Sequence, residues 1–218
     1  MKIAVINPNS TVSMTEKIAD AARAVAPGDE IMAITCHRSP PAIQGPEDDA
    51  ICRPFVLAEV ARAAAEGAEA AVIACFDDPA LAEARAMVTI PVLGIGEAAF
   101  HAAMMLGQRF SVVTTLPVAI PVIEANIARY GISGACARVR AAGVRVLDLE
   151  EAGSAAAARV SAEIARAKAE EKPGAVVLGC AGMADLAARL EAEHGLKVID
   201  GVAAATVFAR ALATMRGA

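Results

Sequence analysis

Short apolar runs alternate along this chain with longer segments in which apolar residues recur every three or four positions. The runs are rich in β-branched residues, as is typical of buried strands, and the longer segments are typical of amphipathic helices. Strands are expected at about 2–6, 30–35, 70–74, 92–95, 110–115, 174–179 and 197–199, with one or two more within 135–149. Helices are expected at about 11–26, 50–66, 79–87, 96–106, 117–130, 152–171, 183–193 and 202–215. This alternation predicts an α/β fold with parallel sheets.

The second half of the chain repeats the first. Cys75 and Cys180 are 105 residues apart, each follows an apolar run, and each has a leucine six residues later. The strand at 3–7 matches the strand at 110–114 at nearly the same displacement. We therefore expect two pseudo-symmetric lobes, each a parallel sheet flanked by helices with right-handed crossovers, and an active site in the cleft between them. The expected parts are a first lobe at 1–96, a second lobe at 97–201 and a C-terminal helix at 202–218 that returns to the first lobe.

Each lobe carries one cysteine where a strand ends and a helix begins. Ligands of open α/β sheets lie at the carboxyl ends of the strands, so Cys75 and Cys180 are placed where chemistry takes place. Backbone N–H groups at a helix start favour a thiolate, which predicts lowered thiol pKa values. Two such groups on opposite sides of a carbon could remove a proton from one face and deliver another to the opposite face. The pattern predicts a pair of activated cysteines that face one cleft.

Hydroxyl side chains follow the first strand of each predicted lobe. A carbanion next to a carbonyl needs its charge held, and backbone N–H groups together with hydroxyls could form such an oxyanion site. The candidates are Ser10, Thr11, Thr114 and Thr115. The loop expected at 36–49 carries three prolines and is long enough to be a lid or a substrate-facing loop, although an ordinary surface connection explains it equally well.

The charge, the length of the apolar runs and the motif content argue against several classes of function. The chain has 25 acidic and 20 basic residues, a formal charge of -5, and no cluster of Lys and Arg, so nucleic acid is not an expected partner. No apolar run approaches the roughly 18 residues of a membrane span, and no signal-peptide pattern precedes the first strand, so we expect a cytoplasmic protein without a membrane partner. No Walker loop, GxGxxG motif or helical zinc motif is present, and no cofactor or metal is expected.

The remaining cysteines and the histidines give weaker signals. Five cysteines without CxxC spacing predict reduced thiols. We expect Cys52 and Cys136 to be small buried hydrophobes and Cys36 to be a weaker third candidate for a reactive thiol. The three histidines share no ligand-like spacing and are expected to be structural or exposed; they are His37, His101 and His194.

Three segments carry a resemblance to a known family. Residues 6–11 (INPNST), 74–79 (ACFDDP) and 177–183 (VLGCAGM) resemble the hydantoin racemase branch of the aspartate/glutamate/hydantoin racemase superfamily. The resemblance implies a homo-oligomeric, cofactor-independent racemase of 5-substituted hydantoins that uses two bases, with Cys75 and Cys180 in the roles of the catalytic thiols. A racemase of allantoin, which is itself a ureido-hydantoin, is the close alternative.

The residues after each cysteine separate this chain from related families. Glutamate racemases typically have Asn-Thr and Thr-His there, whereas Phe76-Asp77 and Ala181-Gly182 suit a less charged ring. Asp77 could accept a ring N–H or favour a helix dipole, Phe76 could line the pocket or pack in a core, and Asn9 could contact substrate or form a turn.

Other activities on this scaffold are less favoured. Arylmalonate decarboxylases use one cysteine, so Cys180 argues against decarboxylation, and maleate isomerases remain a minor alternative. The rival from a different class is a non-enzymatic thiol sensor or small-molecule binding protein.

Overall fold

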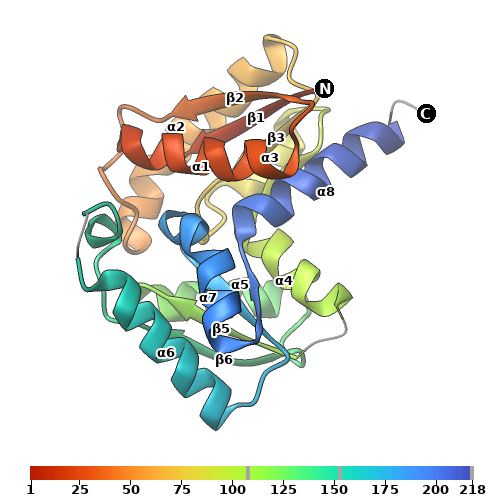
Figure 1. Ribbon diagram of the computed structural model, residues 1–218. Coiled ribbons are helices and arrows are strands. Elements are labelled where there is room, and N and C mark those ends of the chain that lie inside the picture. The colour runs from red at the N-terminus through yellow and green to blue at the C-terminus, as the bar shows by residue number, and fades with distance from the viewer. Residues whose placement is uncertain (107–108, 152–153, 217–218) are drawn as a thin grey trace.

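Two four-stranded parallel sheets with the same strand order form the molecule (Figure 1). The computed structural model describes residues 1–106, 109–151 and 154–216. The first sheet has the order β2-β1-β3-β4, and the second has the equivalent order β6-β5-β7-β8. The strands are β1 (Lys2–Asn7), β2 (Glu30–Thr35), β3 (Ala70–Ile73), β4 (Val92–Gly94), β5 (Phe110–Thr114), β6 (Cys136–Ala141), β7 (Ala175–Gly179) and β8 (Lys197–Ile199). The predicted α/β class with two parallel sheets is confirmed.

Helices connect the strands and cover both sheets. The α-helices are α1 (Val12–Val25), α2 (Pro46–Ala65), α3 (Leu81–Met87), α4 (Ile95–Met105), α5 (Ile120–Arg129), α6 (Ala156–Glu170), α7 (Ala187–His194) and α8 (Gly201–Arg216). Short 3₁₀ helices are η1 (Pro117–Ala119), η2 (Val146–Leu149) and η3 (Ala181–Leu186). Within the described residues, no helix is both long enough and apolar enough to cross a membrane.

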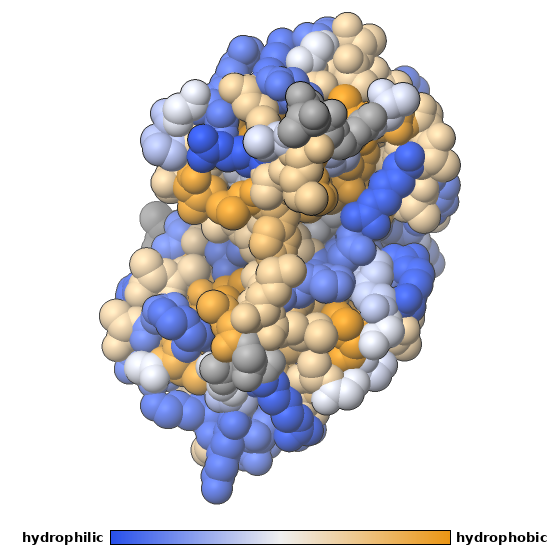
Figure 2. Space-filling model, turned by 90° about the vertical axis from the view of Figure 1, so that its right-hand side faces the viewer, coloured by the Kyte–Doolittle hydropathy of each residue, from blue (hydrophilic) through white to orange (hydrophobic). Residues whose placement is uncertain are grey.

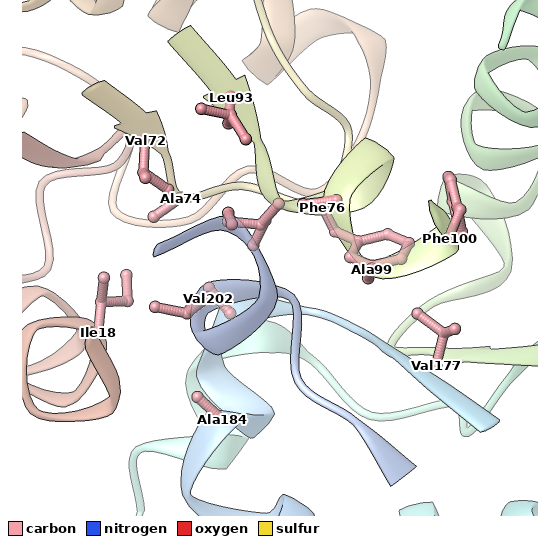
Figure 3. Packing of buried hydrophobic residues seen from close by; sticks show 14 of the residues in the cluster. Ile18, Val72, Ala74, Phe76, Leu93, Ala99, Phe100, Val177, Ala184 and Val202 are labelled. Atoms are coloured by element: carbon pink, nitrogen blue, oxygen red, sulfur yellow. The ribbon is translucent and has the colours of Figure 1, made fainter. Parts of the chain in front are cut away.

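One apolar core joins the two sheets. Val72 of β3 and Val177 of β7 belong to the same buried cluster, together with Phe100 of α4 and Val202 of α8 (Figure 3). The Phe100 ring stacks on Phe110 with centroids 5.6 Å apart and meets Phe76 edge to face at 5.3 Å. Since these contacts run from the segment after β3 to β5, they join the two sheets through one core.

The C-terminal helix α8 packs against α1, β3 and α4. Val202, Ala205 and Ala209 on its inner face are fully buried, whereas Leu212 and Met215 are exposed. Figure 2 looks onto the side that carries α8 and α4, where apolar residues gather between the two halves of the molecule. The helix therefore buries its inner face next to both lobes.

Several element boundaries in the structure differ from the predicted ones. Helix α2 begins at Pro46 rather than near Ala50, because proline fits the first helical turn and Glu47, Asp48 and Asp49 favour the helix N-terminus. The loop predicted at 36–49 is therefore shorter and ends at Gly45. The segment 135–149 holds one strand and η2, and the helix predicted from Met183 starts as the 3₁₀ helix η3. The predicted helix start at Ala152 lies outside the described residues, and α6 begins at Ala156.

Candidate active site

Both predicted thiols line the same cavity. Cys75 lies two residues after β3, and Cys180 directly follows β7, the strand at the equivalent place in the second sheet. The cavity has about 480 Å³ of empty space, part of it open to solvent. Both thiols are partly exposed, and all five cysteines are free. The arrangement gives one small site with a thiol contributed by each lobe.

Most of the other predicted site residues line this cavity too. They are Asn9, Phe76, Asp77, Thr114, Thr115 and Ala181. Ser10, Thr11 and Gly182 are not among the described lining residues. The Ser10 N–H donates to the Pro40 carbonyl at 3.0 Å, and the Thr11 hydroxyl donates to the Pro41 carbonyl at 2.7 Å. These two residues therefore hold the loop 36–45, and the Thr11 hydroxyl does not cap α1.

Sequence reasoning missed several apolar and amide residues of the cavity wall. They are Met14, Ile43, Gln44, Ala74, Leu116, Ala119, Val146 and Gly179. Gln44 accepts a hydrogen bond from the Val146 N–H at 3.2 Å, which connects the loop 36–45 to the second lobe. The prolines of this loop indicated that its residues, including Ile43 and Gln44, could face the substrate. No feature of the sequence indicated such a position for Val146, because the position of η2 depends on tertiary packing.

Burial dominates the acidity of both thiols. It raises the pKa of Cys180 to about 11 and that of Cys75 well above its ordinary value, and the nearby Asp77 carboxylate raises both further. The Asp77 N–H lowers the pKa of Cys75, and the Gly182 N–H and Lys17 lower that of Cys180, but these effects are smaller. The expectation that helix-start N–H groups leave both thiols with lowered pKa values is wrong. Burial therefore favours the thiol form over the thiolate at both cysteines.

Asp77 is the unusual carboxyl of the site. The residue is 9% exposed, and within the described part of the chain its carboxylate has no hydrogen-bond partner. Burial, with the negative charges of Asp49 and Asp78, raises its pKa from 3.8 to about 7. A buried carboxylate without a partner destabilises the fold. In this cavity it is free to accept a hydrogen bond from a ligand.

The other polar side chains of the cavity differ in how many hydrogen bonds they already form within the protein. The Thr114 hydroxyl donates to the Gly179 carbonyl at 2.9 Å, so its proton is not available to a ligand. Asn9 accepts from the Thr11 N–H at 2.9 Å and donates to the Met14 sulfur at 3.0 Å, so its side chain is used within the turn. Thr115 is buried, and no partner for its hydroxyl occurs among the described residues. Thr115 is therefore the hydroxyl best placed to donate to a bound oxyanion.

Neither the third candidate thiol nor a metal cluster adds to the site. Cys36 is buried, and burial together with Glu59 raises its pKa to about 12. Among the described residues, no group of three or more His, Cys, Asp or Glu side chains is arranged to hold a metal ion.

Comparison with known proteins agrees with this geometry. Residues 3–209 match the family model for Asp/Glu/hydantoin racemase. A hydantoin racemase from Rhizobium meliloti is 45% identical over 213 residues, which cover 97% of this chain and 88% of the relative. The chain belongs to the Asp/Glu/hydantoin racemase family. It is therefore an isomerase, and the family predicted from the three sequence segments is confirmed.

Solved structures of the family superpose closely on this enzyme. An allantoin racemase from Klebsiella pneumoniae has a TM-score of 0.96 and 43% identity, covering 99% of this chain and 89% of that one. An allantoin racemase from Pseudomonas fluorescens has a TM-score of 0.94 and 36% identity, covering 99% and 92% of the two chains. The curated and the structural relatives thus carry two different substrate names.

Proposed function

We propose that this enzyme racemises 5-substituted hydantoins by two-base proton transfer between Cys75 and Cys180, without a cofactor. The observation that carries the proposal is the position of two free thiols at equivalent strand ends of the two lobes, where both line one cavity. A planar ring held between them would present opposite faces of its stereocentre to the two sulfur atoms.

The proton transfers follow from that position. The thiolate of one cysteine takes the proton from carbon 5 of the ring and becomes a thiol, and the electron pair of the broken C–H bond delocalises onto the oxygen of the adjacent carbonyl. The thiol of the other cysteine then donates its proton to the opposite face and becomes a thiolate. The Thr115 hydroxyl and the backbone N–H groups of Phe76 and Ala181 are the donors we assign to the oxyanion.

Asp77 gives the ring its orientation in this proposal. Hydantoins carry two N–H groups, and a carboxylate without a partner in the cavity wall can accept one of them. This interaction would place carbon 5 between the thiols and would suit a neutral ring better than a free amino acid, whose carboxylate Asp77 would repel.

The residues of the cavity wall determine which substituent at carbon 5 can fit. Ile43, Leu116, Ala119 and Val146 give the cavity an apolar side that suits an alkyl or benzyl group. Allantoin is the second candidate, because the Gln44 carboxamide also lines the cavity and could pair with a ureido group. The names of the two solved relatives favour the second candidate, and that of the curated relative favours the first.

Polarimetry tests the proposal directly. Purified enzyme without added cofactor is mixed with enantiopure 5-benzylhydantoin and, separately, with enantiopure allantoin, and optical rotation is followed beside an enzyme-free control. We expect the rotation to decay to zero faster than in the control, and the substrate with the higher kcat/KM identifies the subclass. Unchanged rotation with both substrates would contradict the proposal and favour maleate isomerisation or the thiol-sensor hypothesis.

A further inference from the structure

The two thiol loops have the same hydrogen-bond pattern around the residue two positions after each cysteine. The Asp77 N–H lowers the pKa of the Cys75 thiol, and the Gly182 N–H lowers that of the Cys180 thiol. The carbonyls of the same two residues accept hydrogen bonds from side chains. Asn126 donates to the Asp77 carbonyl at 2.9 Å, and the Lys17 ammonium donates to the Gly182 carbonyl at 3.3 Å.

Each of these side chains comes from the opposite lobe. Lys17 lies on α1, which follows the first strand of the first sheet, and contacts the Cys180 loop of the second. Asn126 lies on α5, which follows the first strand of the second sheet, and contacts the Cys75 loop of the first. The equivalent helices of the two lobes therefore exchange contacts across the cleft.

Further contacts strengthen both attachments. The Lys17 ammonium also donates to the Leu149 carbonyl at 3.2 Å and pairs with Glu150 at 2.9 Å. On the other side, the Tyr130 hydroxyl of the segment that ends α5 donates to the buried Asp78 carboxylate at 2.7 Å. Asp78 and Ala80 adopt positive φ angles of 50° and 57°, so the Cys75 loop is strained and needs such contacts to keep its shape.

We propose that Lys17 and Asn126 are positioning residues, each of which holds the thiol loop of the opposite lobe so that its sulfur faces the substrate. The inference rests on the proposed two-thiol mechanism. Because the carbonyl of Asp77 or Gly182 is held by a side chain of the opposite lobe, the loop that carries the thiol keeps its position relative to that lobe. The Lys17 ammonium is a positive charge near Cys180, whereas Asn126 brings no charge near Cys75. Of the acidic side chains, Asp77 lies near both thiols and Glu150 lies near Cys180.

The test compares Lys17→Met with Asn126→Ala in the full chain. Hydrogen exchange followed by mass spectrometry reports the loops at 75–80 and 180–186, and kcat and KM are measured with the hydantoin substrate. We expect Lys17→Met to raise exchange only in 180–186 and Asn126→Ala only in 75–80. Each should lower kcat about tenfold to a hundredfold, since small displacements of a reacting group are costly, while KM changes by less than about twofold.

Control variants separate positioning from a general loss of structure. Lys17→Arg keeps the donor and should restore both kcat and protection of 180–186, and Lys168→Met removes a lysine that contacts the His194 carbonyl instead. Tyr130→Phe tests the same loop as Asn126→Ala if the latter does not fold. Exchange that rises in both loops of either variant, or in neither, would overturn the inference. If the wild-type enzyme turns over no hydantoin, the proposed function fails, while the exchange data still decide whether the contacts hold the loops.

Discussion

Replacing either Cys75 or Cys180 by serine lowers kcat/KM for racemisation by about a thousandfold or more. A serine hydroxyl is far less acidic than a thiol, and loss of one positioned acid or base commonly costs about 10² to 10⁴ in rate. The two variants should lose inversion equally, because each base is needed in both directions. Chiral chromatography of the product from each enantiomer measures the effect.

The two variants should still differ from each other in proton exchange. A remaining thiol can remove and return a proton on its own face, so each variant should exchange the carbon 5 hydrogen of only one enantiomer with D2O, and the two variants should select opposite enantiomers. Cys136→Ser is the matched control, since Cys136 is a partly exposed free thiol on β6 that is not among the cavity-lining residues. Normal racemisation by either Cys75→Ser or Cys180→Ser would contradict the proposed roles.

Asp77→Asn should make the protein more stable and the enzyme poorer at binding its substrate. The pKa of Asp77 is raised from 3.8 to about 7, so the folded state holds a proton that the unfolded chain has already released. Wild-type stability therefore falls as pH rises from about 4 to about 7, and above pH 7 the loss approaches about 4 kcal/mol. The asparagine variant lacks this ionisation and should gain that amount at pH 8 and almost nothing at pH 4.

Urea unfolding of both proteins at pH 4 and pH 8 measures this difference, with Glu16→Gln as an exposed control. In the variant, KM for the hydantoin should rise about tenfold, because a neutral acceptor binds an N–H more weakly than a carboxylate. Alkylation of Cys75 should become faster at pH 8, because the negative charge that raises its pKa is gone. Equal urea midpoints at pH 8 would show that Asp77 is not held in an unfavourable environment.

The sequence was sufficient to predict the strands and the joint position of the two thiols. Apolar runs mark β3 and β7 because buried parallel strands need them on both faces, and the residues that follow such strands lie at the carboxyl edge of their own sheet. The repeat at about 105 residues then predicts that Cys75 and Cys180 occupy equivalent places.

The rest of the site depends on contacts that no local pattern encodes. Lys17 reads as an exposed position of an amphipathic helix, and only the packing of the two lobes brings its ammonium to the Gly182 carbonyl. The thiol pKa values were predicted with the wrong sign, because the N–H groups can be inferred from a helix start whereas the extent of burial cannot. The early start of α2 was missed because Pro46 reads as a loop residue unless its place in the first turn is known.

The most direct test of two-base racemisation is the distribution of label at early times in D2O. Enantiopure 5-benzylhydantoin, or allantoin if that is the better substrate, is incubated with the enzyme in D2O, and the reaction is stopped before a tenth of the substrate has reacted. The two enantiomers are then separated, and the deuterium content of each is measured by mass spectrometry. Transfer between Cys75 and Cys180 predicts one deuterium in the inverted product and none above the enzyme-free control in the remaining substrate. Equal labelling of product and remaining substrate would mean that one base serves both faces and would contradict the proposed mechanism.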